Sequence, residues 1–326
     1  MEIRWITADG VTRPTVDELP RLLKEDTGVV WVDLPADDPE AVPLLTDVFG
    51  FHPKAVRDCV ERSAVPKVHV YPDHVFVVLH APERGSRGHI HYVELDQFVS
   101  ERYVVSVHGP VNPAVSPAAM RVETDAVAAR IDGARLPCPS GYQLSTAIVS
   151  ALTGRMHDHI AARTTEVWHF EQQVTAGERG DVEEFLDGMF RVRHGLLTVR
   201  TMAAQSAGVY GRMQRLAVYG AAGQSMLENN LDQFERLASM AHTQEDYLKG
   251  VIEFFQTRTN TKMTVAAERL AVISAVTLPV TALSSVMGMN VIVNSSSDPT
   301  FVAVLVAVMV VMASILLIWA KRHGWW

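Results

Sequence analysis

Residues 270–290 read LAVISAVTLPVTALSSVMGMN and end in the tripeptide GMN at positions 288–290. The stretch before the tripeptide, 270–287, consists of Leu, Val, Ile, Ala and Met with small hydroxyls and one proline. A second apolar stretch, FVAVLVAVMVVMASILLIWA, follows at 301–320. A helix needs about 20 apolar residues to cross the roughly 30 Å hydrocarbon core of a bilayer. The two stretches therefore predict a C-terminal membrane hairpin with spans at 270–287 and 300–320.

Basic residues flank this hairpin on one side only, because they precede the first span and follow the second, and the connecting loop has no Lys or Arg. They are Arg258, Lys262, Arg269, Lys321, Arg322 and His323. Since Lys and Arg are enriched in cytosolic flanks, we expect both termini in the cytosol and the C-terminal tryptophans at the inner interface. The N-terminal MEIRWITADG lacks the apolar segment of a cleaved signal. A multi-pass protein of the plasma (inner) membrane is therefore expected.

The composition fits a membrane protein with a large water-soluble part. Of the 326 residues, 48% are hydrophobic and 20% are charged, which is too many charges for a chain that lies in a bilayer throughout. The net charge of -8 and the absence of a basic patch argue against a nucleic-acid partner. Cys59 and Cys138 stand apart from each other and from any CxxC motif. We therefore expect reduced cysteines and neither a disulfide framework nor a thiolate metal site.

Residues 1–135 alternate between strand-like and helix-like patterns. Short helices are expected at 39–49 and 53–62, and the turn-rich residues 83–88 separate two strands of a hairpin. Runs rich in Val, Ile, Phe and Tyr predict strands at 2–7, 28–34, 67–71, 74–79, 90–99 and 103–108. The predicted fold class is an α/β N-terminal cytosolic domain, of α/β or α/β/α type, followed by a long helical stalk and two C-terminal transmembrane helices.

Most of the chain beyond the Pro-rich linker at 137–141 is predicted to be helical, with a break near 176–180. Farther on, apolar residues recur in steps of four and three, at Leu227, Leu231, Phe234, Ala238, Ala241, Leu248, Ile252 and Phe255. Such a heptad-like seam is typical of an ordinary bundle helix or of a stalk that packs against copies of itself. We expect the stalk, since a two-span chain also needs further copies to surround an ion path.

The expected segments follow from these patterns. They are the cytosolic α/β domain 1–135, a helical hairpin region 140–225, the stalk 226–269, the first span 270–287, an extracellular GMN loop 288–299, the second span 300–320 and a basic cytosolic tail 321–326.

Small and polar residues share one side of the first span, since they recur at intervals of three and four. They are Ser274, Thr277 or Leu278, Thr281, Ser284 or Ser285, and Gly288. Such a stripe is typical of tight helix packing in a membrane or of a pore lining. The stripe ends at an asparagine, which favours the pore. An amide oxygen at an open helix end is better suited to binding an ion than to packing against another helix.

Several motifs resemble those of one family. Residues 258–263, RTNTKM, resemble an Asn-x-x-Met at the start of the first span, and residues 278–281, LPVT, resemble a mid-span Pro-hydrophobic-Thr. Similar upstream segments are 31–34 (WVDL), 49–53 (FGFHP), Asp58, 66–68 (PKV) and Tyr71. With the GMN tripeptide, they make nearly the whole chain resemble the CorA family of divalent-cation channels. The resemblance implies a homopentameric channel that carries Mg²⁺ and is regulated by Mg²⁺ on cytosolic carboxylates.

The resemblance also implies the site. Gly288, Met289 and Asn290 would form the selectivity filter, with Asn290 and Gly288 holding hydrated Mg²⁺ by outer-sphere contacts. The expected pore-lining residues are Asn260, Met263, Thr264, Ala267, Leu270, Ser274, Leu278, Thr281 and Ser285. Two features depart from the family. Its pore asparagine should fall near Thr264, whereas the asparagine of this chain lies about one helical turn earlier. The loop carries one carboxylate, Asp298, where many relatives have a more acidic segment.

The expected ion chemistry follows from Mg²⁺, which gives up its water reluctantly and is best held hydrated by oxygens. A potential of 100 mV supplies about 4.6 kcal/mol for two charges, and the chain has no G-x-x-x-x-G-K-[ST] motif for ATP. Met263, Ala267 and Leu270 could form an apolar collar that gates by dewetting, or could pack against a neighbouring helix. No set of nucleophile, base and orienting residue is recognisable, so we expect no enzyme.

Other interpretations stay open at this stage. Co²⁺ and Ni²⁺ are candidate passengers, and a ZntB-like branch that moves Zn²⁺ commonly has Val where this chain has Met289. A membrane-tethered sensor or scaffold is the alternative without transport. The histidine pairs His89/His91 and His157/His159 could seed a transition-metal site, although surface histidines are the commoner explanation. Acidic faces at 181–184 and 245–246 could bind regulatory Mg²⁺ or be solvated.

Overall fold

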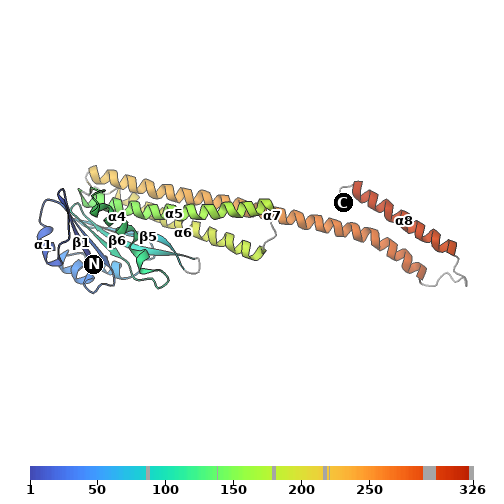
Figure 1. Ribbon diagram of the computed structural model, residues 1–326, viewed down its shortest axis with the longest axis horizontal. Coiled ribbons are helices and arrows are strands. Elements are labelled where there is room, and N and C mark those ends of the chain that lie inside the picture. The colour runs from blue at the N-terminus through green and yellow to red at the C-terminus, as the bar shows by residue number, and fades with distance from the viewer. Residues whose placement is uncertain are drawn as a thin grey trace. The chain divides into compact units, whose positions relative to one another are not determined.

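The computed structural model describes residues 1–85, 89–137, 139–177, 181–215, 219, 221–288 and 299–322. The chain forms two compact units, Met1–Gly250 and Val251–Trp326. Figure 1 shows the strands and shorter helices within the first unit and the last helix within the second. Each unit is considered by itself below.

The centre of the first unit is a seven-stranded sheet with the order β2-β1-β3-β7-β6-β5-β4. Among the described strand pairs only β3–β7 is parallel, and its register places Val32 opposite Val105. The strands are β1 (Glu2–Thr7), β2 (Gly10–Thr12), β3 (Val29–Pro35), β4 (Lys67–Val70), β5 (Val75–Arg84), β6 (Ile90–Val99) and β7 (Tyr103–His108). Strands β3 and β7 are buried almost throughout, as expected of parallel neighbours covered on both faces.

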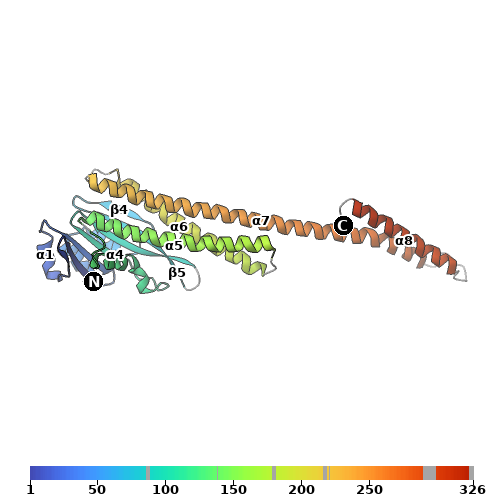
Figure 2. The same ribbon diagram turned by 45° about the horizontal axis from the view of Figure 1, so that its top comes forward.

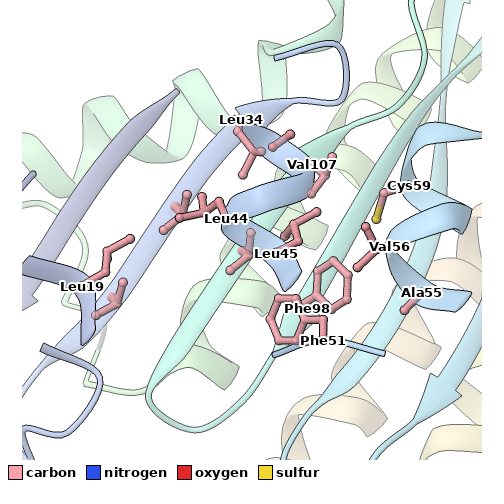
Figure 3. Packing of buried hydrophobic residues seen from close by; sticks show 14 of the residues in the cluster. Leu19, Leu34, Leu44, Leu45, Phe51, Ala55, Val56, Cys59, Phe98 and Val107 are labelled. Carbon is pink, nitrogen blue, oxygen red and sulfur yellow. The ribbon is translucent and has the colours of Figure 1, made fainter. Parts of the chain in front are cut away.

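Short helices cover one face of this sheet. They are α1 (Leu19–Leu22), α2 (Ala41–Pro43), which continues into a π-helical turn at Leu44–Val48, and α3 (Pro53–Val60). Figure 3 shows their side chains meeting those of the strands, where the rings of Phe51 and Phe98 stack with centroids 3.9 Å apart. The His52 side chain caps α3 by accepting a hydrogen bond from the Lys54 backbone N–H. This layer forms the larger apolar core of the sheet.

Long helices cover the other face. These are α4 (Val122–Asp132), α5 (Gly141–Ala176), α6 (Val182–Met213) and the first part of α7 (Ala221–Gly288). Ser140 and Asp181 cap the N-termini of α5 and α6 through their side chains, and Gly177 ends α5 in the left-handed conformation. In both Figure 1 and Figure 2, α5, α6 and the first part of α7 run side by side. The predicted α/β domain is thus a three-layer α/β/α arrangement.

The seam on α7 corrects one expectation. Leu227, Phe234, Ala241 and Leu248, spaced seven residues apart, are buried within their own chain. The Phe234 ring stacks on Tyr210 of α6 with centroids 5.5 Å apart, and the Thr153 hydroxyl of α5 donates to the Gln233 side-chain oxygen at 2.7 Å. This part of α7 therefore packs as an ordinary bundle helix and needs no second copy to bury its apolar side.

Element ends differ from the predictions in places. Strand β5 extends to Arg84 instead of ending at 79, because its partner β6 pairs with it through to Ile90. The short strand β2 and helix α1 were not predicted; three or four residues are too few to show a period. The helix expected at 39–49 is present as α2 and its π-helical continuation.

Candidate ion pathway

The second unit contains the end of α7 and all of α8 (Pro299–Arg322). Within the described residues, these two helices are long and apolar enough to cross a membrane. Helix α7 continues through Pro279 to Gly288. Between residues 270 and 288 it contains no ionisable side chain. A cation beside this segment would therefore meet hydroxyls, apolar groups and backbone dipoles.

The predicted pore-lining residues occupy one face of α7, which we call the stripe face. Its members are Asn260, Met263, Ala267, Leu270, Ser274, Leu278, Thr281 and Ser285, and all are exposed. With about 100° of rotation per residue, each lies within about 40° of Ser274 around the helix axis. Thr264 is also exposed but lies about 80° away. The structure thus brings all but one of the described lining candidates onto a single uncovered face.

The opposite side of α7 is partly covered by the chain itself. The residues that are not fully exposed there form the covered face: Glu268, Val272, Val276, Pro279, Val280 and Leu283. They lie about 120–240° from Ser274. Val272 is only 2% exposed, and Ala320 of α8 is also buried. In Figures 1 and 2, α8 runs back along the end of α7. One chain therefore covers part of one side of its first span, around Val272, and leaves the stripe face open.

The hydroxyls near the stripe face are partly engaged by the helix. The Thr281 hydroxyl donates to the Thr277 carbonyl, and the Thr277 hydroxyl donates to the Ile273 carbonyl, both at 2.8 Å. The Thr264 hydroxyl donates to the Asn260 carbonyl at 3.0 Å. A hydroxyl that donates in this way still has acceptor lone pairs. Its oxygen can therefore accept a hydrogen bond from the water shell of a cation.

The filter candidates are only partly described. Gly288 is the last residue of α7, so it stands at the end of the helix that bears the stripe face. Met289 and Asn290 lie outside the described residues. The same is true of the loop residue Asp298. The filter assignment therefore stays a prediction.

The secondary metal candidates find other roles. Asp181 caps α6 through the Glu183 and Glu184 backbone N–H groups, and the Glu245 carboxylate forms an ion pair with Arg200 at 2.9 Å. His159 is largely buried, and burial together with Arg163 lowers its pKa to about 4. Among the described residues, no three His, Cys, Asp or Glu side chains are placed to hold a metal ion. Within the described residues, neither histidine pair therefore has a third side chain placed to complete a metal site.

One polar cluster was not singled out from the sequence. Glu94 and Asp96 alternate with apolar residues on β6 and are both buried beneath α3 and the loop that follows it. Strict alternation predicts that the two carboxylates share a face of the strand. It does not reveal that another layer covers that face.

Comparison with known proteins agrees with this architecture. The family profile described as CorA-like Mg²⁺ transporter protein matches residues 26–322. A protein of Bacillus subtilis (strain 168), provisionally named metal ion transporter YfjQ, is 21% identical over 327 residues, covering 98% of each chain. The profile match extends from the N-terminal sheet through both candidate spans.

Solved structures share the fold. The complete structure of the CorA magnesium transporter from Methanocaldococcus jannaschii matches with a TM-score of 0.80 at 16% identity, covering 100% of this chain and 99% of that one. The full-length CmaX protein matches with a TM-score of 0.76 at 16% identity and coverages of 100% and 98%. The cytoplasmic domain of ZntB from Vibrio parahaemolyticus RIMD 2210633 matches with a TM-score of 0.60 at 10% identity, covering 80% of this chain and 98% of that one.

These findings confirm the resemblance and the fold class: an N-terminal α/β domain, a long helix and two C-terminal apolar helices. Members of the matched family are transporters and not enzymes. The alternative of a scaffold without transport has no support from this family match. The chain belongs to the CorA-like Mg²⁺ transporter family, and its function is divalent metal ion transport.

Proposed function

We propose that the chain is a channel for hydrated Mg²⁺, formed by several copies whose stripe faces surround a common axis. The observation that carries the proposal is that the stripe face of α7 is exposed throughout, whereas the opposite side is partly covered, with Val272 buried. If the exposed face met only lipid, its hydroxyls would have no polar partner beyond their own helix. Facing an axis, they contact water and ions.

The need for several copies is supported by the geometry, and the number five comes from the family resemblance. Two spans cannot enclose a path, so the stripe faces of other copies must complete it. A homopentamer, as the family resemblance implies, would place five copies of Ser274, Leu278 and Thr281 around the axis.

Mg²⁺ suits the groups that this path offers. Hydroxyl and amide oxygens can hold a hydrated ion through its water shell without the strong binding that a ring of carboxylates would produce. The membrane potential is enough to drive entry, since two charges gain about 4.6 kcal/mol across 100 mV. Gly288 and Asn290 would form the outer mouth, and both termini would lie in the cytosol by the distribution of Lys and Arg. Cytosolic Mg²⁺ would close the channel.

Transport of Zn²⁺ is the second candidate, because the ZntB cytoplasmic domain has the same fold. Zn²⁺ prefers nitrogen and sulfur ligands. The described stripe face offers no histidine or cysteine, which favours Mg²⁺. Co²⁺ and Ni²⁺ stay as secondary passengers to be measured beside it.

The test uses the full chain in proteoliposomes with an imposed potential. Asn290→Ala should abolish Mg²⁺ uptake while detergent-solubilised protein keeps the mass of five copies. In a background with Cys59→Ala and Cys138→Ser, single cysteines at Ser274 or Ser285 should make uptake sensitive to a positively charged thiol reagent. The matched cysteines at Val276 and Leu283, on the covered face, should remain insensitive.

Three results would contradict the proposal. Undiminished Mg²⁺ uptake in the Asn290 variant removes the mouth assignment. Equal sensitivity at stripe and covered positions removes the pore face. Faster uptake of Zn²⁺ than of Mg²⁺ at equal concentration assigns the channel to zinc instead.

A further inference from the structure

Two carboxylates lie next to each other beneath the surface of the first unit. Glu94 and Asp96 are 4% and 0% exposed, and both point from β6 to the side of the sheet covered by α3. Phe98, two residues farther along the same face, belongs to the apolar core. Cys59 of α3 lies against Asp96 and is itself fully buried. Two acidic groups are thus enclosed in a largely apolar part of the protein.

Their hydrogen bonds are unequal. One Glu94 carboxylate oxygen accepts from the Ser63 backbone N–H at 2.8 Å. The other Glu94 oxygen and both Asp96 oxygens have no hydrogen-bond partner with normal geometry. A buried carboxylate without donors is strongly disfavoured in its charged form, and a second carboxylate nearby disfavours it further. Both groups cannot be ionised here at low cost.

The groups that face the pair do not neutralise it. Lys67 of β4 is bound to Asp58 of α3 at 2.8 Å, and Arg62 lies over the Tyr92 ring at 4.8 Å. His80 of β5 binds the Ser63 carbonyl through Nε2 at 2.9 Å and is 4.0 Å from Glu94. Burial lowers the pKa of His80 to about 4, so it is neutral at neutral pH. The remaining neighbour, the Cys59 thiol, has a pKa raised by burial and by Asp96.

A proton fits this cluster better than a metal ion. Within the described ranges, no three His, Cys, Asp or Glu side chains are arranged to ligate a metal. A proton on one carboxylate removes the like-charge repulsion and one buried charge at once. Asp96 is the better place for it, because Glu94 keeps the Ser63 N–H as a donor to its charged form.

We propose that Glu94 and Asp96 form a proton-binding site that holds one proton at neutral pH, and that losing this proton loosens the α3–β4 loop. That loop, residues 61–66, is fastened at Ser63 by Glu94 through its N–H and by His80 through its carbonyl. With both carboxylates charged, water must enter to solvate them. The loop is the covering segment that can move to admit it, since Glu61, Arg62, Ala64 and Val65 are already exposed.

The sign of the pH effect follows from linkage. Burial and Glu94 raise the pKa of Asp96 above its unfolded value, so the folded state binds a proton that the unfolded chain releases. Proton binding at this site therefore stabilises the folded state at low pH. This stabilisation is lost as the pH rises above about 4 and through the neutral range. The isosteric variant Asp96→Asn needs no proton at this position, so it should not lose stability in this way.

The experiment measures the full chain in detergent. Infrared difference spectra should show a protonated-carboxyl band in the wild type at pH 7 that Asp96→Asn removes. The Tm of Asp96→Asn minus that of the wild type should increase by at least about 3 °C between pH 5 and pH 8. Exchange of the Ser63 amide, corrected for intrinsic rate, should accelerate at least about tenfold over this range in the wild type only, since the proton's binding energy is then lost.

Glu94→Gln provides a second variant should Asp96→Asn fold poorly, and it should show the same trend in Tm. Glu61→Gln is the control, because Glu61 is an exposed carboxylate in the same loop. Absence of the band at pH 7, or a Tm difference that stays constant from pH 5 to pH 8, would overturn the proposal. So would a rise in wild-type Tm with Mg²⁺ or Zn²⁺ that Asp96→Asn abolishes, because it would make the cluster a metal site.

Discussion

The two units of this chain differ in how far their apolar side chains are exposed. In the first unit the largest apolar side chains, among them Trp31, Phe98 and Phe234, are buried. Buried polar groups there are often paired, as in His108 with Asp33 at 2.9 Å. In the second unit most of the described apolar residues face outward, with Leu278 67% exposed. Apolar surface on this scale is stable only against a solvent other than water or against other copies.

Helix α7 belongs to both units and shows where the change occurs. Phe234 is fully buried, whereas Phe254 on the same helix is 54% exposed. Both are helical phenylalanines, so their difference is one of surroundings and not of local structure. The exposed fractions of these two side chains therefore report directly how far each part of the helix is covered.

The first prediction tests this comparison by replacing each of the two phenylalanines with alanine. Phe234→Ala should lower the free energy of unfolding of the first unit by about 3–5 kcal/mol, because it leaves a cavity beside Tyr210. Phe254→Ala should change it by less than about 0.5 kcal/mol if that side chain faces water. Denaturation followed by circular dichroism in detergent measures both.

A large loss of stability in Phe254→Ala would instead mean that this side chain is covered. A cost of about 2 kcal/mol or more, dependent on protein concentration, would show that a second copy buries Phe254. A small effect from Phe234→Ala would mean that the packing of α6 and α7 described here is wrong.

The second prediction concerns pH and the first unit alone. Because burial and neighbouring arginines lower the pKa of His159 to about 4, the folded state binds fewer protons than the unfolded chain between about pH 4 and 6.5. Stability present above pH 6.5 is thus lost as pH falls toward 4, by about 2–3 kcal/mol. His159→Gln should flatten this part of the Tm profile.

His157 provides the control, since it lies on the same helix and is exposed. His157→Gln should leave the pH dependence of Tm unchanged. An unaltered profile in the His159 variant would mean that its charge is compensated in the folded protein.

The third prediction concerns the second unit and has the smallest expected effect. Leu270 lies on the stripe face at the N-terminal end of the span, where an apolar collar would exclude hydrated ions. Leu270→Ser should raise Mg²⁺ flux several-fold at cytosolic Mg²⁺ levels that close the wild type. Val265→Ser, also exposed but about 180° from Ser274 around the helix, should not. Equal behaviour of the two variants would place the constriction elsewhere.

Much of the fold is predictable because its signals are local. Strands β6 and β7 begin and end at the predicted residues 90–99 and 103–108, since β-branched and aromatic runs bounded by turn residues need no distant information. The two spans are equally clear from length and composition. The one-sided stripe also follows from helical period alone, and the described residues place its members on one exposed face.

Partners are not local, and here the predictions were incomplete or wrong. The seam at Leu227, Phe234 and Ala241 has the same spacing whether it meets another copy or α5 and α6 of its own chain. Only the tertiary structure shows that its own chain covers it. In this case the sequence identifies an apolar face but not the segment that packs against it.

The same distinction applies to the carboxylates of β6. The sequence by itself determined that Glu94 and Asp96 share a face, that two helices are apolar enough to span a membrane, and that Gly288 follows a polar stripe. The tertiary structure decided that α3 and its loop enclose the two carboxylates and that the chain covers part of the side of α7 opposite the stripe. The physical reason is that period and composition depend on neighbouring residues, whereas burial depends on which distant segment packs over them.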